Sequence, residues 1–182
     1  NTALGPGKGG IRMTLGVTLQ EVFRLARTMT WKNALAGIPF GGAKAGIVFP
    51  KEKSARKKEY IQSFARAIQP FIPGRYIAGP DVNTGEKEMQ WFAEAVGDWR
   101  AATGKPAGFC DMHKKSAPQN SIPESRRKCG LPHELGSTGF GVAYAAKTAA
   151  EIIGLDMEGA RVAIEGFGNV GSFVFEHLRG MG

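Results

Sequence analysis

Residues 75–84 read RYIAGPDVNT, and this stretch decides the fold class. Its first four residues include the aromatic and β-branched types that favour a strand, and the Gly-Pro pair that follows ends the strand. Asn83 or Thr84 is then expected to cap a helix that runs to about Gly104. A strand that leads through a turn into a helix is typical of an α/β domain with a parallel sheet. We therefore predict that Asp81 lies at the carboxyl end of a strand, where open α/β sheets place ligands.

The segments before this stretch repeat the alternation of helix and strand. Thr18 and Glu21 have the spacing of a capping box, which predicts a helix that ends near Ala36. Residues 47–49 predict a short strand, and a second helix is expected to begin at Ser54. The amino-terminal part of the chain is therefore predicted to have an α/β fold with a mostly parallel sheet.

A further strand–turn–helix unit is expected after a polar loop. Residues 137–153 predict a helix, and residues 161–171, which read RVAIEGFGNVG, predict a strand followed by a glycine-rich turn. Such glycines let a pyrophosphate approach a helix N-terminus, here expected at 172–178, although a plain turn is the alternative. The acidic residue that distinguishes NAD from NADP would stand about 20 residues later, so both cofactors stay open. The turn consists of Gly166, Phe167, Gly168, Asn169, Val170 and Gly171.

Three lysines have surroundings that suggest a site for an anionic small molecule. Lys44 lies in the run GGAKAG and Lys8 in the run GPGKGGIR, where glycines let the backbone approach a ligand. Lys32 is expected to project from the apolar face of the first helix. Burial and mutual repulsion can lower the pKa of a lysine, and a neutral lysine can activate water. Asp81 would supply a carboxylate for proton transfer; the alternatives are solvated lysines and a turn aspartate.

Composition limits the class of protein and its partners. The chain has 182 residues, of which 42% are hydrophobic and 22% charged, as in soluble globular proteins. No apolar run approaches the ~18 residues of a membrane span, so no membrane partner is expected. The net charge of +8 comes largely from residues 51–58 and 114–128, and the second cluster has no interleaved aromatic residues, so we predict no nucleic-acid partner. Two cysteines make no disulfide framework, which predicts a cytoplasmic protein. Both chain ends suggest a fragment.

The loop before the fourth helix contains a possible zinc site. Cys110 and His113 stand at one end of the loop, and Cys129 and His133 stand at the other, with spacings compatible with four zinc ligands. The loop between these pairs is strongly basic, and a single cysteine pair is common by chance. We therefore predict no metal and keep zinc as the alternative.

These motifs, in their order along the chain, resemble the glutamate/leucine/phenylalanine/valine dehydrogenase family. The resemblance implies a substrate-binding, catalytic domain at 1–136, followed by the beginning of a Rossmann NAD- or NADP-binding domain at 137–182. It also implies a homo-oligomer, a hexamer. The motifs that carry it, over nearly the whole chain, are residues 5–12, 30–33, 39–46, 79–84, 137–141 and 166–171.

The resemblance also implies roles for single residues. Lys44 would be the catalytic lysine, and Asp81 would move protons to and from the substrate amino group. Lys8 would bind the side-chain carboxylate of the substrate, Lys32 its α-carboxylate, and Thr138 would lie near the nicotinamide. The implied reaction is the reversible oxidative deamination of L-glutamate to 2-oxoglutarate and ammonium. Lys8 favours glutamate because a buried cation is costly beside an apolar side chain, and another amino acid is the alternative.

Overall fold

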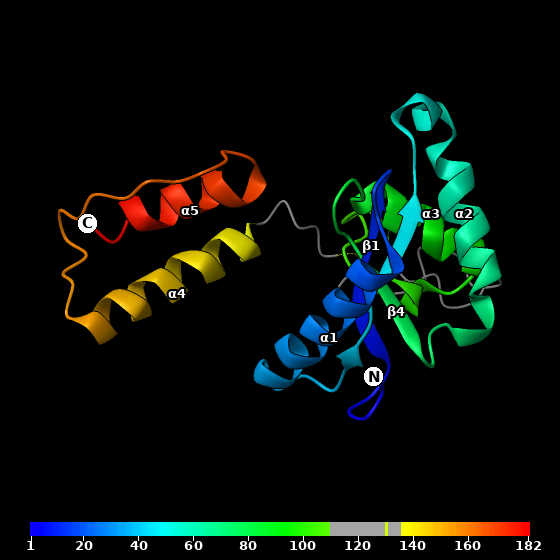
Figure 1. Ribbon diagram of the computed structural model, residues 1–182, viewed down its shortest axis with the longest axis horizontal. Helices are drawn as coiled ribbons and strands as arrows, with labels where there is room; N and C mark the ends of the chain where they lie inside the picture. Colours follow the sequence, from blue (N-terminus) through cyan, green and yellow to red (C-terminus); the bar gives the residue numbers. More distant parts are fainter. Residues whose placement is uncertain (110–129, 131–135) are drawn as a thin grey trace, which may run out of the picture. The chain divides into compact units, whose positions relative to one another are not determined.

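The computed structural model describes residues 1–109, 130 and 136–182. The chain divides into two compact units, Asn1–Pro132 and His133–Gly182, and each is described by itself. The first unit contains a four-stranded parallel sheet with helices packed on it (Figure 1). The prediction of an α/β fold with a parallel sheet is therefore confirmed.

The central strand of the sheet is β1 (Gly7–Thr14), and all its neighbours run parallel to it. β2 (Gly41–Gly42) and β3 (Ala45–Val48) pair with β1 in one continuous register, and β4 (Tyr76–Gly79) also pairs with it. Within this unit, strands were expected at 47–49 and 75–78, and both formed. Sequence reasoning did not predict β1 as a strand, because glycine is depleted in strands.

The glycines of β1 are needed because other chain segments lie very close to it. A Cβ atom built on Gly9 would lie 1.6 Å from the carbonyl oxygen of Ala43, and one built on Gly10 would lie 2.6 Å from that of Pro80. Strand pairing on both sides satisfies the backbone groups of β1, which offsets the low strand propensity of glycine. Tertiary contacts therefore override the local preference here.

One face of the sheet forms the hydrophobic core with two helices. Ile11 and Met13 of β1 are fully buried, and α2 (Lys57–Ala67) and α3 (Glu86–Val96) pack against each other beside the sheet (Figure 1). The second helix begins at Lys57, because Ser54 belongs to a preceding 3₁₀ segment. Short 3₁₀ helices complete the unit at Lys51–Arg56, Gln69–Phe71 and Trp99–Ala101.

The first helix, α1 (Leu19–Leu35), packs against β2 and β1 and has the limits predicted from the sequence. The hydroxyl of Thr18 accepts a hydrogen bond from the backbone N–H of Glu21 at 3.2 Å, which caps the helix. Near the other end, the buried Asn33 donates from Nδ2 to the carbonyl of Gly41 at 2.6 Å. These contacts fix the helix at both ends.

Two predictions about the helix after β4 are wrong. Its N-cap is Gly85 and not Asn83 or Thr84, because the Thr84 hydroxyl instead accepts from the backbone N–H of Asp81 and donates to the carbonyl of Ile11. The helix ends at Gly97 and not near Gly104, because Gly97 has φ +77°, a left-handed conformation that stops the helix.

The second unit contains two helices, α4 (Ser137–Ile153) and α5 (Asn169–Arg179), which pack against each other. α4 has the predicted limits, and α5 includes the predicted helix at 172–178. The predicted strand at 161–165 is wrong: these residues form no helix or strand, and most are exposed. A strand needs a neighbour to satisfy its N–H and C=O groups, and the described part of this unit offers none.

Candidate active site

The register of the sheet places four charged side chains on the face opposite the core. Alternation along β1 puts Lys8 and Arg12 on that face, since Ile11 points into the core. Lys44 lies between β2 and β3 in the same register, and Asp81 follows the carboxyl end of β4, as predicted. The strands therefore bring together side chains that are far apart in the sequence.

Asp81 is the centre of this group, because both its carboxylate oxygens are bound. Nζ of Lys44 lies 2.8 Å from Oδ1, and Nε of Arg12 lies 2.8 Å from Oδ2. The side chain of Lys44 is 8% exposed and that of Asp81 is 17% exposed. Burial by itself would raise the pKa of Asp81, but the hydrogen bonds from Arg12 and Lys44 lower it below its ordinary value. Asp81 is therefore a carboxylate at neutral pH.

Lys8 is a lysine whose protonation is strongly altered by its surroundings. Desolvation and, less strongly, the nearby charges of Lys105 and Lys44 together lower its pKa from 10.5 to about 8. The absence of a side chain at Gly79 makes room for the amine, since a Cβ there would lie 2.6 Å from Nζ of Lys8. The predicted effect of burial and mutual repulsion on a lysine therefore falls on Lys8.

Lys32 lies in a different environment from the other predicted lysines. It is exposed near the end of α1, whereas the neighbouring Asn33 is the residue of that helix that is buried. The prediction that Lys32 projects from the apolar face is therefore wrong. The helix packs against β2 through Asn33, one residue further along, because the carbonyl of Gly41 accepts a hydrogen bond from the Asn33 side-chain amide.

Arg12 belongs to the site, and sequence reasoning missed it. Its Nη1 donates to Oε1 of Glu21 in the first turn of α1, while its Nε donates to Asp81. A strand that contains Lys8 places the residue four positions later on the same face, and this spacing was the available signal. The signal could not be used because β1 was not predicted to be a strand.

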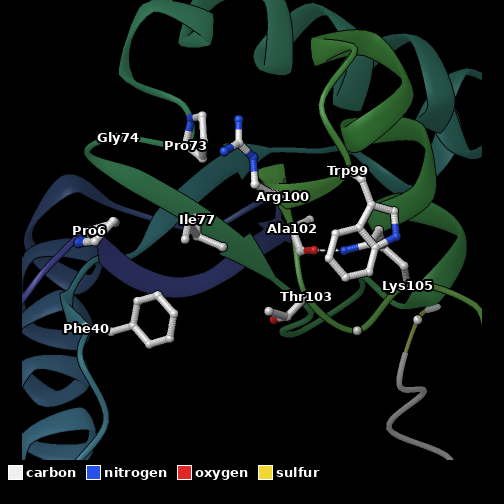
Figure 2. A pocket seen from close by; sticks show the side chains of 12 residues that line it. Pro6, Phe40, Pro73, Gly74, Ile77, Trp99, Arg100, Ala102, Thr103 and Lys105 are labelled. Atoms are coloured by element: carbon white, nitrogen blue, oxygen red, sulfur yellow. Dashed lines mark hydrogen bonds between the residues drawn. The ribbon is translucent and has the colours of Figure 1, made fainter. Parts of the chain in front are cut away.

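A mainly apolar cavity of about 520 Å³ opens on the same unit (Figure 2). Ile77 of β4 lines it, and Ile77 is the register partner of Lys8. Lys105 also lines it: its Nζ donates to the carbonyl of Ala102 and lies 4.2 Å from the ring centroid of Trp99, and the bond to Ala102 is visible in Figure 2. The charge that lowers the pKa of Lys8 is thus held in place by a carbonyl and an aromatic face.

In the second unit, the glycine-rich turn has a shape that depends on its glycines. Gly166 has φ +86°, and a Cβ on Gly171 would lie 2.1 Å from the carbonyl oxygen of Gly166. α5 begins directly after Gly168, and no side chain caps it. The helix N-terminus therefore has backbone N–H groups without a side-chain acceptor, which is the arrangement that suits an anion.

The other residues predicted to contact a cofactor are exposed at the starts of the two helices. Thr138 lies in the first turn of α4, and Phe167 and Val170 are 68% and 41% exposed. Asn169 is the first residue of α5. The structure thus brings Lys8, Lys44 and Asp81 together in the first unit, and describes the glycine-rich turn within the second.

Neither a metal site nor a membrane segment emerges from the described residues. Residues 1–109, 130 and 136–182 contain no cluster of three or more His, Cys, Asp or Glu side chains suited to a metal ion. The alternative zinc ligands Cys110, His113, Cys129 and His133 lie outside the described residues. In the same part of the chain, every helix is too short or too polar to cross a bilayer.

Family models match most of the chain. Residues 1–97 match the Glu/Leu/Phe/Val dehydrogenase dimerisation domain, and residues 130–182 match the Glutamate/Leucine/Phenylalanine/Valine dehydrogenase domain. The protein is thus of the amino-acid dehydrogenase class, which agrees with the lysine–aspartate group on the sheet. The chain belongs to the Glu/Leu/Phe/Val dehydrogenase family.

Relatives and solved structures narrow the similarity to glutamate dehydrogenases. The chain is 37% identical over 191 residues to the NADP-specific glutamate dehydrogenase of Saccharolobus shibatae, covering 100% of this chain and 41% of that protein. It is 34% identical over 192 residues to the NAD-specific glutamate dehydrogenase of Peptoniphilus asaccharolyticus, with the same coverage. A hetero-hexameric glutamate dehydrogenase from Thermus thermophilus superposes with a TM-score of 0.77 at 30% identity, over 100% of this chain and 41% of that one. The chain spans about 41% of the length of these relatives.

Proposed function

We propose that this chain is part of a glutamate dehydrogenase that converts L-glutamate reversibly to 2-oxoglutarate and ammonium with NAD or NADP. The observation that carries the proposal is the 2.8 Å contact between Lys44 and Asp81, beside Lys8 on one sheet face. Relatives named for this activity, some NAD-specific and some NADP-specific, support it. A basic nucleic-acid or zinc-binding module is not favoured, since the relatives named above are dehydrogenases.

The division of the chain into two compact units, Asn1–Pro132 and His133–Gly182, supports two proposed domains. Residues 1–136 would bind the substrate and carry the catalytic groups, and residues 137–182 would begin a Rossmann domain. The glycine-rich turn fits a dinucleotide, because the N-terminus of α5 has no side-chain cap and a Cβ at Gly171 would collide with the turn. NAD or NADP, when bound, supplies the acceptor for the hydride that leaves the substrate Cα. The residues proposed to hold or face it are Thr138 and Gly166, Phe167, Gly168, Asn169, Val170 and Gly171.

The charged groups of the first unit suit the remaining chemistry. Asp81 would accept a proton from the substrate amino group, and Lys44, hydrogen-bonded to Asp81, would activate the water that attacks the iminium carbon. Lys8 would bind the side-chain carboxylate of glutamate, and Lys32 its α-carboxylate. Because an opposite charge favours the ammonium form, substrate binding would raise the pKa of Lys8 from about 8.

The substrate side chain is the point at which family members would differ. A protonated Lys8 beside a leucine or valine side chain would be buried without a counter-charge, which is costly. Glutamate is therefore the proposed substrate, and another amino acid is the alternative. We further propose a cytoplasmic homohexamer; the hetero-hexamer named for the Thermus thermophilus relative supports the number of subunits alone.

The test is the absorbance of NADH and NADPH during reductive amination of 2-oxoglutarate by the full-length protein that contains this chain. Wild-type protein should consume one or both cofactors, and Lys44→Ala should lose activity by about 100-fold or more while remaining folded. Lys53→Ala, which changes an exposed lysine of the Lys51–Arg56 segment, is the matched control and should keep activity. Undiminished 2-oxoglutarate reduction by Lys44→Ala would refute the proposed mechanism.

A further inference from the structure

The proposed chemistry uses one oxygen of Asp81 and leaves the other to Arg12. Oδ1 accepts from Nζ of Lys44, and Oδ2 accepts from Nε of Arg12, both at 2.8 Å. A carboxylate whose two oxygens have different partners cannot rotate about its last bond without breaking one of these hydrogen bonds. The orientation of Asp81 is therefore set by two cations, of which only Lys44 has a proposed role in the reaction.

Arg12 is itself held from the other side by a second carboxylate. Its Nη1 donates to Oε1 of Glu21, and the two groups also form an ion pair. Glu21 lies in the first turn of α1, where its backbone N–H donates to Oγ1 of Thr18 at 3.2 Å. A guanidinium is planar and always charged, so its donors lie in fixed directions. A continuous carboxylate–guanidinium–carboxylate chain thus runs from the start of α1 to Asp81.

The turn that carries Asp81 is anchored to the same strand as Arg12. The backbone N–H of Asp81 donates to Oγ1 of Thr84 at 2.9 Å, and that hydroxyl donates to the carbonyl of Ile11 at 2.6 Å. Nδ2 of Asn83 donates to the carbonyl of Met13 at 3.0 Å. These bonds attach the turn to β1 on both sides of Arg12. Both the main chain and the side chain of Asp81 are therefore held by contacts with β1.

We propose that Arg12 is a positioning residue: it holds Oδ2 of Asp81 so that Oδ1 is presented to Lys44 and to the substrate amino group, and Glu21 orients Arg12 for this purpose. The role toward the substrate amino group rests on the proposed function, whereas the contacts among Glu21, Arg12 and Asp81 do not depend on it. Without Arg12, the Asp81 carboxylate keeps Lys44 as its side-chain partner within the described residues. The carboxylate then rotates toward Lys44 with both oxygens and becomes protonated more readily.

Steady-state kinetics of Arg12→Met in the full-length protein test this proposal. Arg12 contacts Asp81 and not the proposed substrate lysines, so kcat should fall about 100-fold while KM for glutamate changes by less than about 3-fold. The acidic limb of the kcat/KM profile should move up by about 1 pH unit or more, because a cation is lost beside Asp81. Arg12→Lys should return the acidic limb toward its wild-type position, because it restores the charge, and only part of kcat, because an ammonium lacks the planar fork.

Arg56→Met is the matched control, since Arg56 forms an exposed ion pair with Glu59 and not with Asp81. It should leave kcat and the pH profile unchanged. An Arg12→Met enzyme with wild-type kcat and an unmoved acidic limb would overturn the proposal. If Arg12→Met does not fold, as judged by thermal denaturation, Glu21→Gln decides: a smaller fall in kcat supports the proposal, and an unaltered kcat overturns it.

A readout without activity separates this proposal from the proposed function. Carbodiimides activate protonated carboxyl groups, so the pH midpoint of Asp81 modification, followed by peptide mass spectrometry, reports its protonation. Arg12→Met should raise this midpoint by about 1 pH unit or more, whether or not glutamate is turned over. A raised midpoint in a protein without dehydrogenase activity would refute the proposed function alone. An unchanged midpoint would refute the role of Arg12.

Discussion

Replacing Lys8 with methionine should stabilise the protein at neutral pH, in a way that depends on pH. The pKa of Lys8 falls from 10.5 to about 8 because folding removes the amine from water and places it near Lys105 and Lys44. The ammonium form is therefore disfavoured in the folded state. Since each unit of pKa difference is worth about 1.4 kcal/mol, the penalty at neutral pH is about 3 kcal/mol.

The direction of the pH effect follows from proton binding. Between pH 8 and 10.5 the unfolded chain keeps the Lys8 proton that the folded protein has lost, so the free energy of unfolding of the wild type rises with pH. The penalty is fully present below pH 8 and disappears as the pH approaches 10.5. Methionine has a similar length and no charge, so the variant lacks this dependence.

Urea denaturation at several pH values between 6.5 and 10.5 measures the difference. Lys8→Met should exceed the wild type by about 1–3 kcal/mol at pH 7, and the two should converge at the alkaline end. Lys53→Met, at an exposed position, should differ by less than about 0.5 kcal/mol. A variant less stable than wild type at pH 7, or a difference that does not shrink with pH, would contradict this account of Lys8.

Two further predictions concern packing. Gly79→Ala places a Cβ 2.6 Å from the amine of Lys8, so KM for glutamate in the full-length protein, measured by NAD(P)H absorbance, should rise about tenfold. Gly16→Ala is the control and should leave KM unchanged, because a Cβ there meets nothing within 4 Å. Equal KM values for the two variants would exclude this steric role of Gly79. Phe92→Ala removes a fully buried ring and should lower the free energy of unfolding by about 3–5 kcal/mol in urea, whereas Phe23→Ala, 66% exposed, should cost less than about 1 kcal/mol.

Elements with local signals were predicted well from the sequence. Thr18 and Glu21 mark the start of α1, and the helix at Ser137–Ile153 has the predicted limits. Such signals lie within a few residues of the boundary that they determine, because helix hydrogen bonds and caps join near neighbours. The family and the parallel sheet were also predicted correctly, from motifs that are each short and contiguous.

Two predictions failed at segments whose state depends on distant partners. β1 has three glycines among its residues and became the central strand because three other strands pair with it. Residues 161–165 have better strand composition, and they remain unpaired because no neighbouring strand is present in the described part of that unit. Composition measures a preference, whereas a strand is completed only by hydrogen bonds to another strand.

The sequence by itself named Lys8, Lys44 and Asp81, because their glycine-rich or turn-like surroundings are visible along the chain. Only the tertiary structure decided that Lys8 has the lowered pKa and that Arg12 shares Asp81 with Lys44. Arg12 and Lys44 stand 69 and 37 residues from Asp81 in the sequence. Desolvation and charge interactions depend on distance through space, which the sheet register sets and the order of residues does not.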